Sequence, residues 1–145
     1  MTPKSSAATM AGGETATMAT WLGDLLGMEV LESRYGLGRV RMTLKAEHVN
    51  RLGITHGGVI FSLADEAFAM SCNTEEIQTV ACDINLHFYR PTRPGDVLTA
   101  SSTVINQGKT LGTYRLEVHD AEGRLVASGM GLGYRLSRKY DPPAD

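Results

Sequence analysis

The residues best suited to chemistry lie in one segment, which begins His56-Gly57-Gly58 and runs to Met70. We expect a helix to start at the glycines, where free backbone N–H groups and the helix dipole both favour negative charge. A carbonyl oxygen that becomes negative in a transition state suits such a position. The spacing alone also fits a simpler interpretation, in which the glycines permit a tight turn or close packing.

Two adjacent carboxylates, Asp65 and Glu66, follow on the same helix among apolar residues. Desolvation raises the pKa of a carboxyl group and favours a role as base or nucleophile. For Glu66 we prefer a solvated or hydrogen-bonded place at a groove edge, whereas for Asp65 both interpretations stay open. Gly57 and Asp65 stand about 12 Å apart along a helix, so they can act on one carbonyl only from different subunits. A catalytic role therefore predicts a dimer.

The other residues with potentially reactive side chains give weaker evidence for a functional site. His56 could donate to a bound carbonyl or simply fix the loop. The four histidines show no metal-ligand spacing, and we expect no metal and no cofactor. Ser62 lacks the Gly-x-Ser-x-Gly context of a serine-hydrolase nucleophile. Cys72 and Cys82 form no disulfide framework and are typical of a reducing, cytoplasmic location.

Size and composition limit the possible functions. The chain has 145 residues, 42% of them hydrophobic, and a net charge of −2. These values predict one domain, no nucleic-acid partner and, without an apolar run of about 20 residues, no membrane partner. Residues 1–18 are rich in Ala, Thr, Ser and Gly and predict a flexible lead-in. The domain is expected over 19–137, with a C-terminal tail over 138–145.

Periodicity and turn residues predict the elements that position these groups. We expect helices over 18–26 and 57–72, and strands over 28–35, 38–44, 80–89, 96–106, 111–119 and 125–136. This order favours an α+β fold in which a curved antiparallel sheet wraps one long central helix. The glycines that alternate between 129 and 133 would give the last strand a bare face for close packing. A helix apolar on nearly every side needs further cover, which a second subunit would provide.

At these positions the sequence resembles the hotdog-fold acyl-CoA thioesterases, in the branch that includes phenylacetate-pathway thioesterases. The resemblance covers roughly residues 21–135. It is carried by Asn50, His56-Gly57-Gly58, Phe61-Ser62-Leu63-Ala64-Asp65, Ala67-Phe68-Ala69, Cys72-Asn73, Phe88-Tyr89-Arg90-Pro91, Gly95-Asp96 and Gln107-Gly108-Lys109. It implies a homodimer with a continuous sheet, and dimers that commonly pair into homotetramers.

The resemblance also implies hydrolysis of an acyl-CoA substrate, with aromatic acyl groups such as phenylacetyl or hydroxyphenylacetyl somewhat favoured. The Gly57 N–H would polarise the thioester carbonyl, and Asp65 of the opposing subunit would act as general base or nucleophile. Asn50 would hold the water or the carboxylate, and His56 would support the carbonyl site.

Other residues are expected to contact the substrate. They are Gly58, Phe61, Ser62, Phe68, Asn85, Arg90 and Lys109. Arg90 and Lys109 are candidates for the CoA phosphates. Relatives often place a Ser or Thr on the strand after the helix, and here Ala81 cannot take that role, while Asn85 or Asp83 could.

Two alternatives use the same scaffold. A hotdog hydratase or dehydratase would add water to or remove it from an acyl thioester, but the Pro-Gly loop associated with such dehydratases is absent around His56. A non-catalytic acyl-CoA-binding module could keep Gly57 and lose the acid, whereas this chain has Asp65. Hydration of an enoyl-CoA, or binding without turnover, would identify these alternatives.

Overall fold

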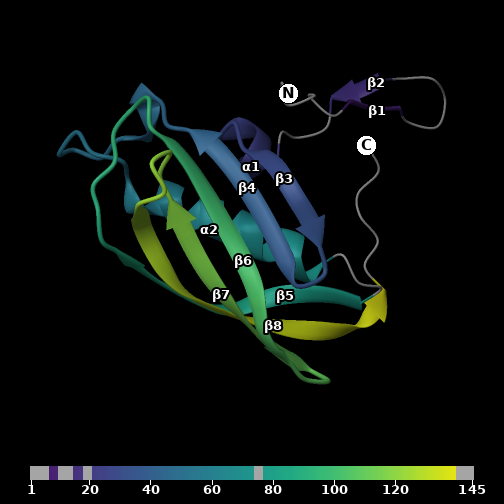
Figure 1. Cartoon of the computed structure of the whole chain (residues 1–145). Coiled ribbons are helices and arrows are strands. Elements are labelled where there is room, and N and C mark those ends of the chain that lie inside the picture. Colours follow the sequence, from purple (N-terminus) through teal and green to yellow (C-terminus); the bar gives the residue numbers. More distant parts are fainter. Residues whose placement is uncertain (1–6, 10–14, 18–20, 74–76, 140–145) are drawn as a thin grey trace.

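A six-stranded antiparallel sheet curves around one long helix in the computed structural model, which describes residues 7–9, 15–17, 21–73 and 77–139 (Figure 1). The strand order is β3-β4-β6-β7-β8-β5. The elements are α1 (Leu22–Leu25), β3 (Glu29–Arg34), β4 (Leu37–Thr43), a 3-10 turn (Ala46–His48), α2 (Gly57–Cys72), β5 (Ile77–Phe88), β6 (Val97–Gln107), β7 (Leu111–His119) and β8 (Leu125–Lys139). The α+β hotdog architecture expected from the sequence is confirmed.

The two ends of the chain add detail to the predicted domain limits. Within the expected lead-in, β1 (Ala7–Thr9) and β2 (Thr15–Thr17) pair antiparallel in a separate two-stranded sheet. The rest of residues 1–18 lies outside the described residues, as does 140–145 of the expected tail. The last strand, β8, includes residues 138 and 139 of that tail.

Helix α2 begins and ends where the sequence predicts. Its buried residues recur at helical spacing and form one face against the sheet: Ile60, Leu63, Ala64, Ala67, Phe68, Ser71 and Cys72. That face packs on the alternating buried side chains of β4, β6 and β7, such as Val40, Leu98 and Leu116. Asp65 lies on the other side of the helix and is exposed in the single chain. The sheet therefore covers one side of α2 and leaves the side with the carboxylate open.

The glycine-bearing face of β8 allows the helix to pack closely, as expected. A Cβ built at Gly131 would lie 3.3 Å from ring atoms of Phe68. Phe68 in turn meets the ring of Tyr114 edge-on, with centroids 5.0 Å apart. The missing side chains therefore leave the space that the Phe68 ring fills.

Strand β5 lies at one edge of the sheet and pairs with β8 alone in the described sheet. It is twelve residues long, and most of its side chains are half-buried or exposed. A long edge strand presents unpaired backbone N–H and C=O groups to another chain. A bulge between Ala81 and Asp83 changes which residues of β5 face the helix.

Candidate active site at the start of helix α2

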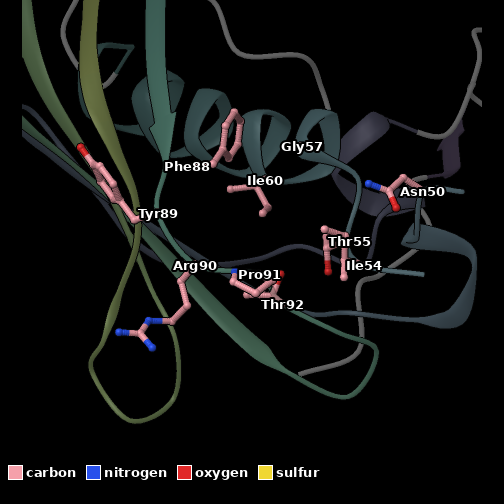
Figure 2. Close-up of a pocket in the computed structure, with 10 residues that line it drawn as sticks. All are labelled: Asn50, Ile54, Thr55, Gly57, Ile60, Phe88, Tyr89, Arg90, Pro91 and Thr92. Carbon is pink, nitrogen blue, oxygen red and sulfur yellow. The ribbon is translucent and has the colours of Figure 1, made fainter. Parts of the chain in front are cut away.

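A cleft of about 340 Å³ opens beside the first turn of α2 (Figure 2). It is lined by Asn50, Ile54, Thr55, Gly57, Ile60, Phe88, Tyr89, Arg90, Pro91 and Thr92. The lining comes from the loop before α2, the start of α2, and the end of β5 with the loop after it. Ile54, Ile60 and Phe88 provide apolar walls, and Gly57 and Asn50 provide polar groups. An apolar cleft with a few convergent polar groups is the usual form of a small-molecule site.

His56 caps the helix and engages two of its first N–H groups. The Gly58 N–H donates to the His56 Nδ1 at 2.9 Å, and the Val59 N–H donates to the His56 carbonyl oxygen at 3.0 Å. In the part of the chain that the structure describes, the Gly57 N–H has no such partner. Gly57 lines the cleft, so its N–H is the donor of this helix terminus that stays available to a ligand.

The two glycines therefore have different roles. A Cβ built at Gly58 would lie 3.0 Å from His56 Nδ1, which is tighter than an ordinary contact, so a side chain there would displace the ring. A Cβ at Gly57 would lie 3.4 Å from the Phe88 Cζ, an ordinary van der Waals distance. The Gly58 N–H is already hydrogen-bonded to His56, so the predicted contact of Gly58 with substrate would not use this N–H.

Asn50 is held by a tight loop that fixes what it can offer. Its Oδ1 accepts a hydrogen bond from the Leu52 N–H at 2.9 Å, and its backbone N–H donates to the Ile54 carbonyl at 2.8 Å. No acceptor in the described segments takes the Nδ2 protons. Figure 2 shows the amide nitrogen on the side of the carboxamide nearer Gly57. Asn50 can therefore act toward the cleft as a hydrogen-bond donor.

Asp65 does not line the cleft of its own chain. It lies about two helical turns from Gly57, or roughly 12 Å of rise. The protein packed around Asp65 desolvates its carboxyl group and raises its pKa. A raised pKa gives a stronger base, but one too far from the cleft of the same chain to act there.

Glu66 is enclosed by the short helix α1. Its Oε1 would lie 3.5 Å from a Cβ built at Gly23. Burial, followed by the charges of Asp65 and Asp24, raises the pKa of Glu66. We expected Glu66 at the edge of a groove. The structure places it half-buried beneath α1, away from the cleft.

Several predicted substrate contacts are placed elsewhere. Phe68 is only 1% exposed within the core, so the prediction that it touches substrate is wrong. Ser62 Oγ donates to the Gly58 carbonyl at 2.8 Å. Phe61 is half-buried on α2 but does not line the cleft, and Lys109 is exposed in the turn between β6 and β7. Arg90 does line the cleft, although its guanidinium points away from Gly57 in Figure 2.

Asn85 lies on the face of the sheet opposite α2. It pairs with Met130, which alternates with the helix-facing Gly131. Asp83 shares that outer face, since it pairs with Leu132. Neither residue is brought to the cleft of its own chain, where the aliphatic hydroxyl groups that line the cleft are those of Thr55 and Thr92.

Sequence reasoning did not assign a site role to Ile54, Thr55 or Thr92, which line the cleft. Of the Phe88-Tyr89-Arg90-Pro91 run, only Arg90 was assigned a contact with substrate, and the proline three residues after the end of β5 is the local signal that the chain turns here. The described residues contain no cluster of three His, Cys, Asp or Glu side chains able to hold a metal ion. None of their helices is long and apolar enough to cross a membrane.

Comparisons with known proteins agree on one family. Residues 52–127 match the model of the thioesterase superfamily. The acyl-coenzyme A thioesterase PaaI of Escherichia coli is 38% identical over 111 residues, which cover 77% of this chain and 79% of PaaI. The solved structure of E. coli PaaI superposes with a TM-score of 0.78 at 36% identity, covering 81% of this chain and 85% of that one.

A second solved structure, the TT0310 protein of Thermus thermophilus, has a TM-score of 0.77 and 35% identity. The match covers 82% of this chain and all of that one. Family model, sequence identity and fold thus agree over the region that builds the cleft. The chain belongs to the thioesterase superfamily, as a hotdog-fold thioester hydrolase related to PaaI.

Proposed function

We propose that this protein hydrolyses acyl-CoA thioesters to the free acid and CoA, with Gly57 and the partner subunit's Asp65 as the central groups of each site. The observation that carries the proposal is the one free N–H of the α2 terminus, on Gly57, at the wall of an apolar cleft. The name of the E. coli relative, an acyl-CoA thioesterase, supports the substrate class.

The chemistry follows from the available donors and acceptors. The thioester carbonyl oxygen accepts a hydrogen bond from the Gly57 N–H, which strengthens as the oxygen becomes negative. The Asp65 carboxylate removes a proton from water as the water oxygen attacks the carbonyl carbon. The resulting intermediate collapses with cleavage of the C–S bond, and the CoA sulfur takes the proton from Asp65 as it leaves. The Nδ2 of Asn50 donates to the carboxylate or to the water, because its Oδ1 is already engaged. Direct attack by Asp65 would use the same arrangement: CoA leaves as an anhydride forms on Asp65, and water then hydrolyses the anhydride to the free acid and the carboxylate.

A dimer joined at β5 would bring these groups together. Antiparallel pairing of two β5 edges about a two-fold axis makes one continuous sheet and sets two α2 helices side by side in opposite directions. The start of one helix then faces the middle of the other, where Asp65 lies. The exposed side chains of β5 and the uncovered side of α2 support this arrangement. A tetramer, as a pair of such dimers, is not required for the site.

The cleft is suited to a compact apolar acyl group. Ile54, Ile60, Phe88 and Pro91 line it, and the Phe88 ring lies against Gly57. An aromatic acyl group, such as phenylacetyl or hydroxyphenylacetyl, could stack on this ring. We propose aromatic acyl-CoA thioesters as the preferred class.

A CoA-release assay over a panel of thioesters tests the proposal. The panel contains phenylacetyl-, hydroxyphenylacetyl-, benzoyl- and straight-chain acyl-CoA. We expect turnover by the wild-type protein and a fall in kcat of about 100-fold or more in Asp65→Asn, since the base is lost.

The matched control is Glu122→Gln, which removes an exposed carboxylate in the turn between β7 and β8, outside both the cleft and β5, and should leave turnover unchanged. No release from any thioester by the wild type would overturn the function. Near-normal turnover in Asp65→Asn would overturn only the role of that residue.

A further inference from the structure

We propose that His56 is a positioning residue that acts through Nδ1: its ring accepts a hydrogen bond from the Gly58 N–H and leaves the Gly57 N–H as the single backbone donor at the start of α2 for the thioester oxygen. This inference rests on the proposed function and assigns a role within that site. It differs from the expectation that His56 itself donates to the substrate carbonyl.

The first step concerns the proton on the ring. Gly58 donates its N–H to the His56 Nδ1 at 2.9 Å, so this nitrogen must carry a lone pair. In the neutral ring the proton then sits on Nε2. The contact therefore selects one tautomer, and Nδ1 takes the place of the side-chain oxygen of an ordinary N-cap residue.

The second step concerns which donors remain. The backbone carbonyl of His56 accepts the Val59 N–H, and its ring accepts the Gly58 N–H. Because the Val59 and Gly58 N–H groups are both engaged, a substrate oxygen at the start of α2 can accept from only one backbone N–H of the helix, that of Gly57. If the ring were absent, the first turn would fray and two neighbouring N–H groups would compete for the oxygen. Such misplacement reduces transition-state stabilisation more than ground-state binding.

Gly58 gives an independent reason for this assignment. A Cβ at position 58 would lie 3.0 Å from Nδ1 and 3.2 Å from Cε1 of the same ring. Apart from its two neighbours in the chain, no other described residue has a side chain within 4 Å of that position, so the His56 ring is what an added methyl group would crowd. The second glycine of the His-Gly-Gly run therefore makes room for the histidine ring, and the first carries the free N–H.

Two substitutions separate the ring nitrogens. In His56→Asn the amide oxygen occupies nearly the place of Nδ1, whereas in His56→Gln the terminal amide reaches the place of Nε2. We expect His56→Asn to keep kcat within about threefold of wild type, because Asn is a strong N-cap residue. We expect His56→Gln and Gly58→Ala each to lower kcat at least about tenfold with little change in KM, because oxyanion stabilisation is impaired.

Thermal unfolding identifies any variant that fails to fold. If His56→Gln or Gly58→Ala fails to fold, the kcat of His56→Asn still tests the proposal. Full activity in His56→Gln together with a loss in His56→Asn would show that Nε2–H contacts the substrate and would overturn the proposal. Unchanged kcat in all three variants, or equal losses in both histidine variants, would also overturn it.

A readout that needs no turnover separates this proposal from the proposed function. Nitrogen-15 NMR of the wild-type protein should show His56 protonated on Nε2 and unprotonated on Nδ1, and the Gly58 amide should exchange slowly with solvent. These results would stand even if no thioester were hydrolysed. A His56 ring protonated on Nδ1, or a rapidly exchanging Gly58 amide, would contradict the cap.

Discussion

At the scale of single residues, neighbouring groups already occupy some of the hydrogen-bonding atoms of the candidate site. The atoms that are left determine what the site can offer to a substrate. Asn50 has its oxygen engaged by the Leu52 N–H, and Gly58 has its N–H engaged by His56. What remains toward the cleft is the Asn50 NH₂ and the Gly57 N–H. Both are donors, which suits a site where an oxygen becomes negative.

Asp65 is expected to trade stability for activity. Partial desolvation by the surrounding protein raises the pKa of its carboxyl in the folded chain above the unfolded value, so the ionised form costs folding free energy. The folded state is then most favoured below the unfolded pKa, near 3.9, and loses stability as pH rises through the folded pKa. Asp65→Asn should therefore raise Tm at pH 7 and lose that gain near pH 3.

Thermal unfolding of Asp65→Asn and of Glu122→Gln across pH 3–8 checks this expectation. The control removes an exposed carboxylate and should shift Tm little at any pH. A lower Tm for Asp65→Asn at pH 7 would show that the carboxylate is stabilised in the fold rather than desolvated.

At the scale of elements, a bulge in β5 determines which of its side chains face helix α2. The bulge between Ala81 and Asp83 shifts the alternation by one residue. Ile84, Leu86 and Phe88 then share the helix side, and Phe88 reaches the start of α2. Without the bulge, Asp83 and Asn85 would face the helix.

The close approach of β5, β8 and α2 predicts a specific clash. A Cβ at Gly133 would lie 2.7 Å from the Thr79 Cγ2 and 3.3 Å from the Phe68 Cζ. Thr79 is buried and its backbone N–H is bound to the Asn73 side chain, so it cannot move freely. Gly133→Ala should therefore destabilise the protein by about 1–3 kcal/mol.

Thr79→Ser removes the methyl group in question and provides the matched second variant. In urea unfolding, the double variant should recover part of the loss, with a coupling free energy of about 0.5 kcal/mol or more. Strictly additive effects of the two substitutions would show that the Thr79 methyl is not what resists the added carbon.

At the scale of the whole molecule, the groups that we propose to act together lie in separate places on one chain. The cleft lies at the beginning of α2, and Asp65 lies on the side of α2 that the sheet leaves uncovered. The β5 edge offers the pairing that would bring together these groups from two chains. Activity should therefore belong to the dimer.

Subunit mixing tests this directly. Gly57→Pro removes the one free N–H at the first helical position, where proline is tolerated, and His56 already has the extended backbone that precedes proline. Gly57→Pro and Asp65→Asn should each be nearly inactive alone. An equal mixture, after subunit exchange, should recover about a quarter of wild-type activity, because half of the dimers hold one intact site. No recovery, with mixed dimers demonstrated, would place both groups in one chain.

The sequence by itself determined the helix from Gly57 to Cys72 and the strands, because periodicity, capping and turn chemistry are local properties. It also identified Gly57, Asn50 and Asp65 as the polar groups to examine. Only the tertiary structure decided that Phe68 is core, that Phe88 forms a wall of the cleft and that Asn85 faces away. Those facts depend on how the helix packs on the sheet and on how a bulged strand registers with its neighbour, and neither is encoded in the spacing of residues along the chain.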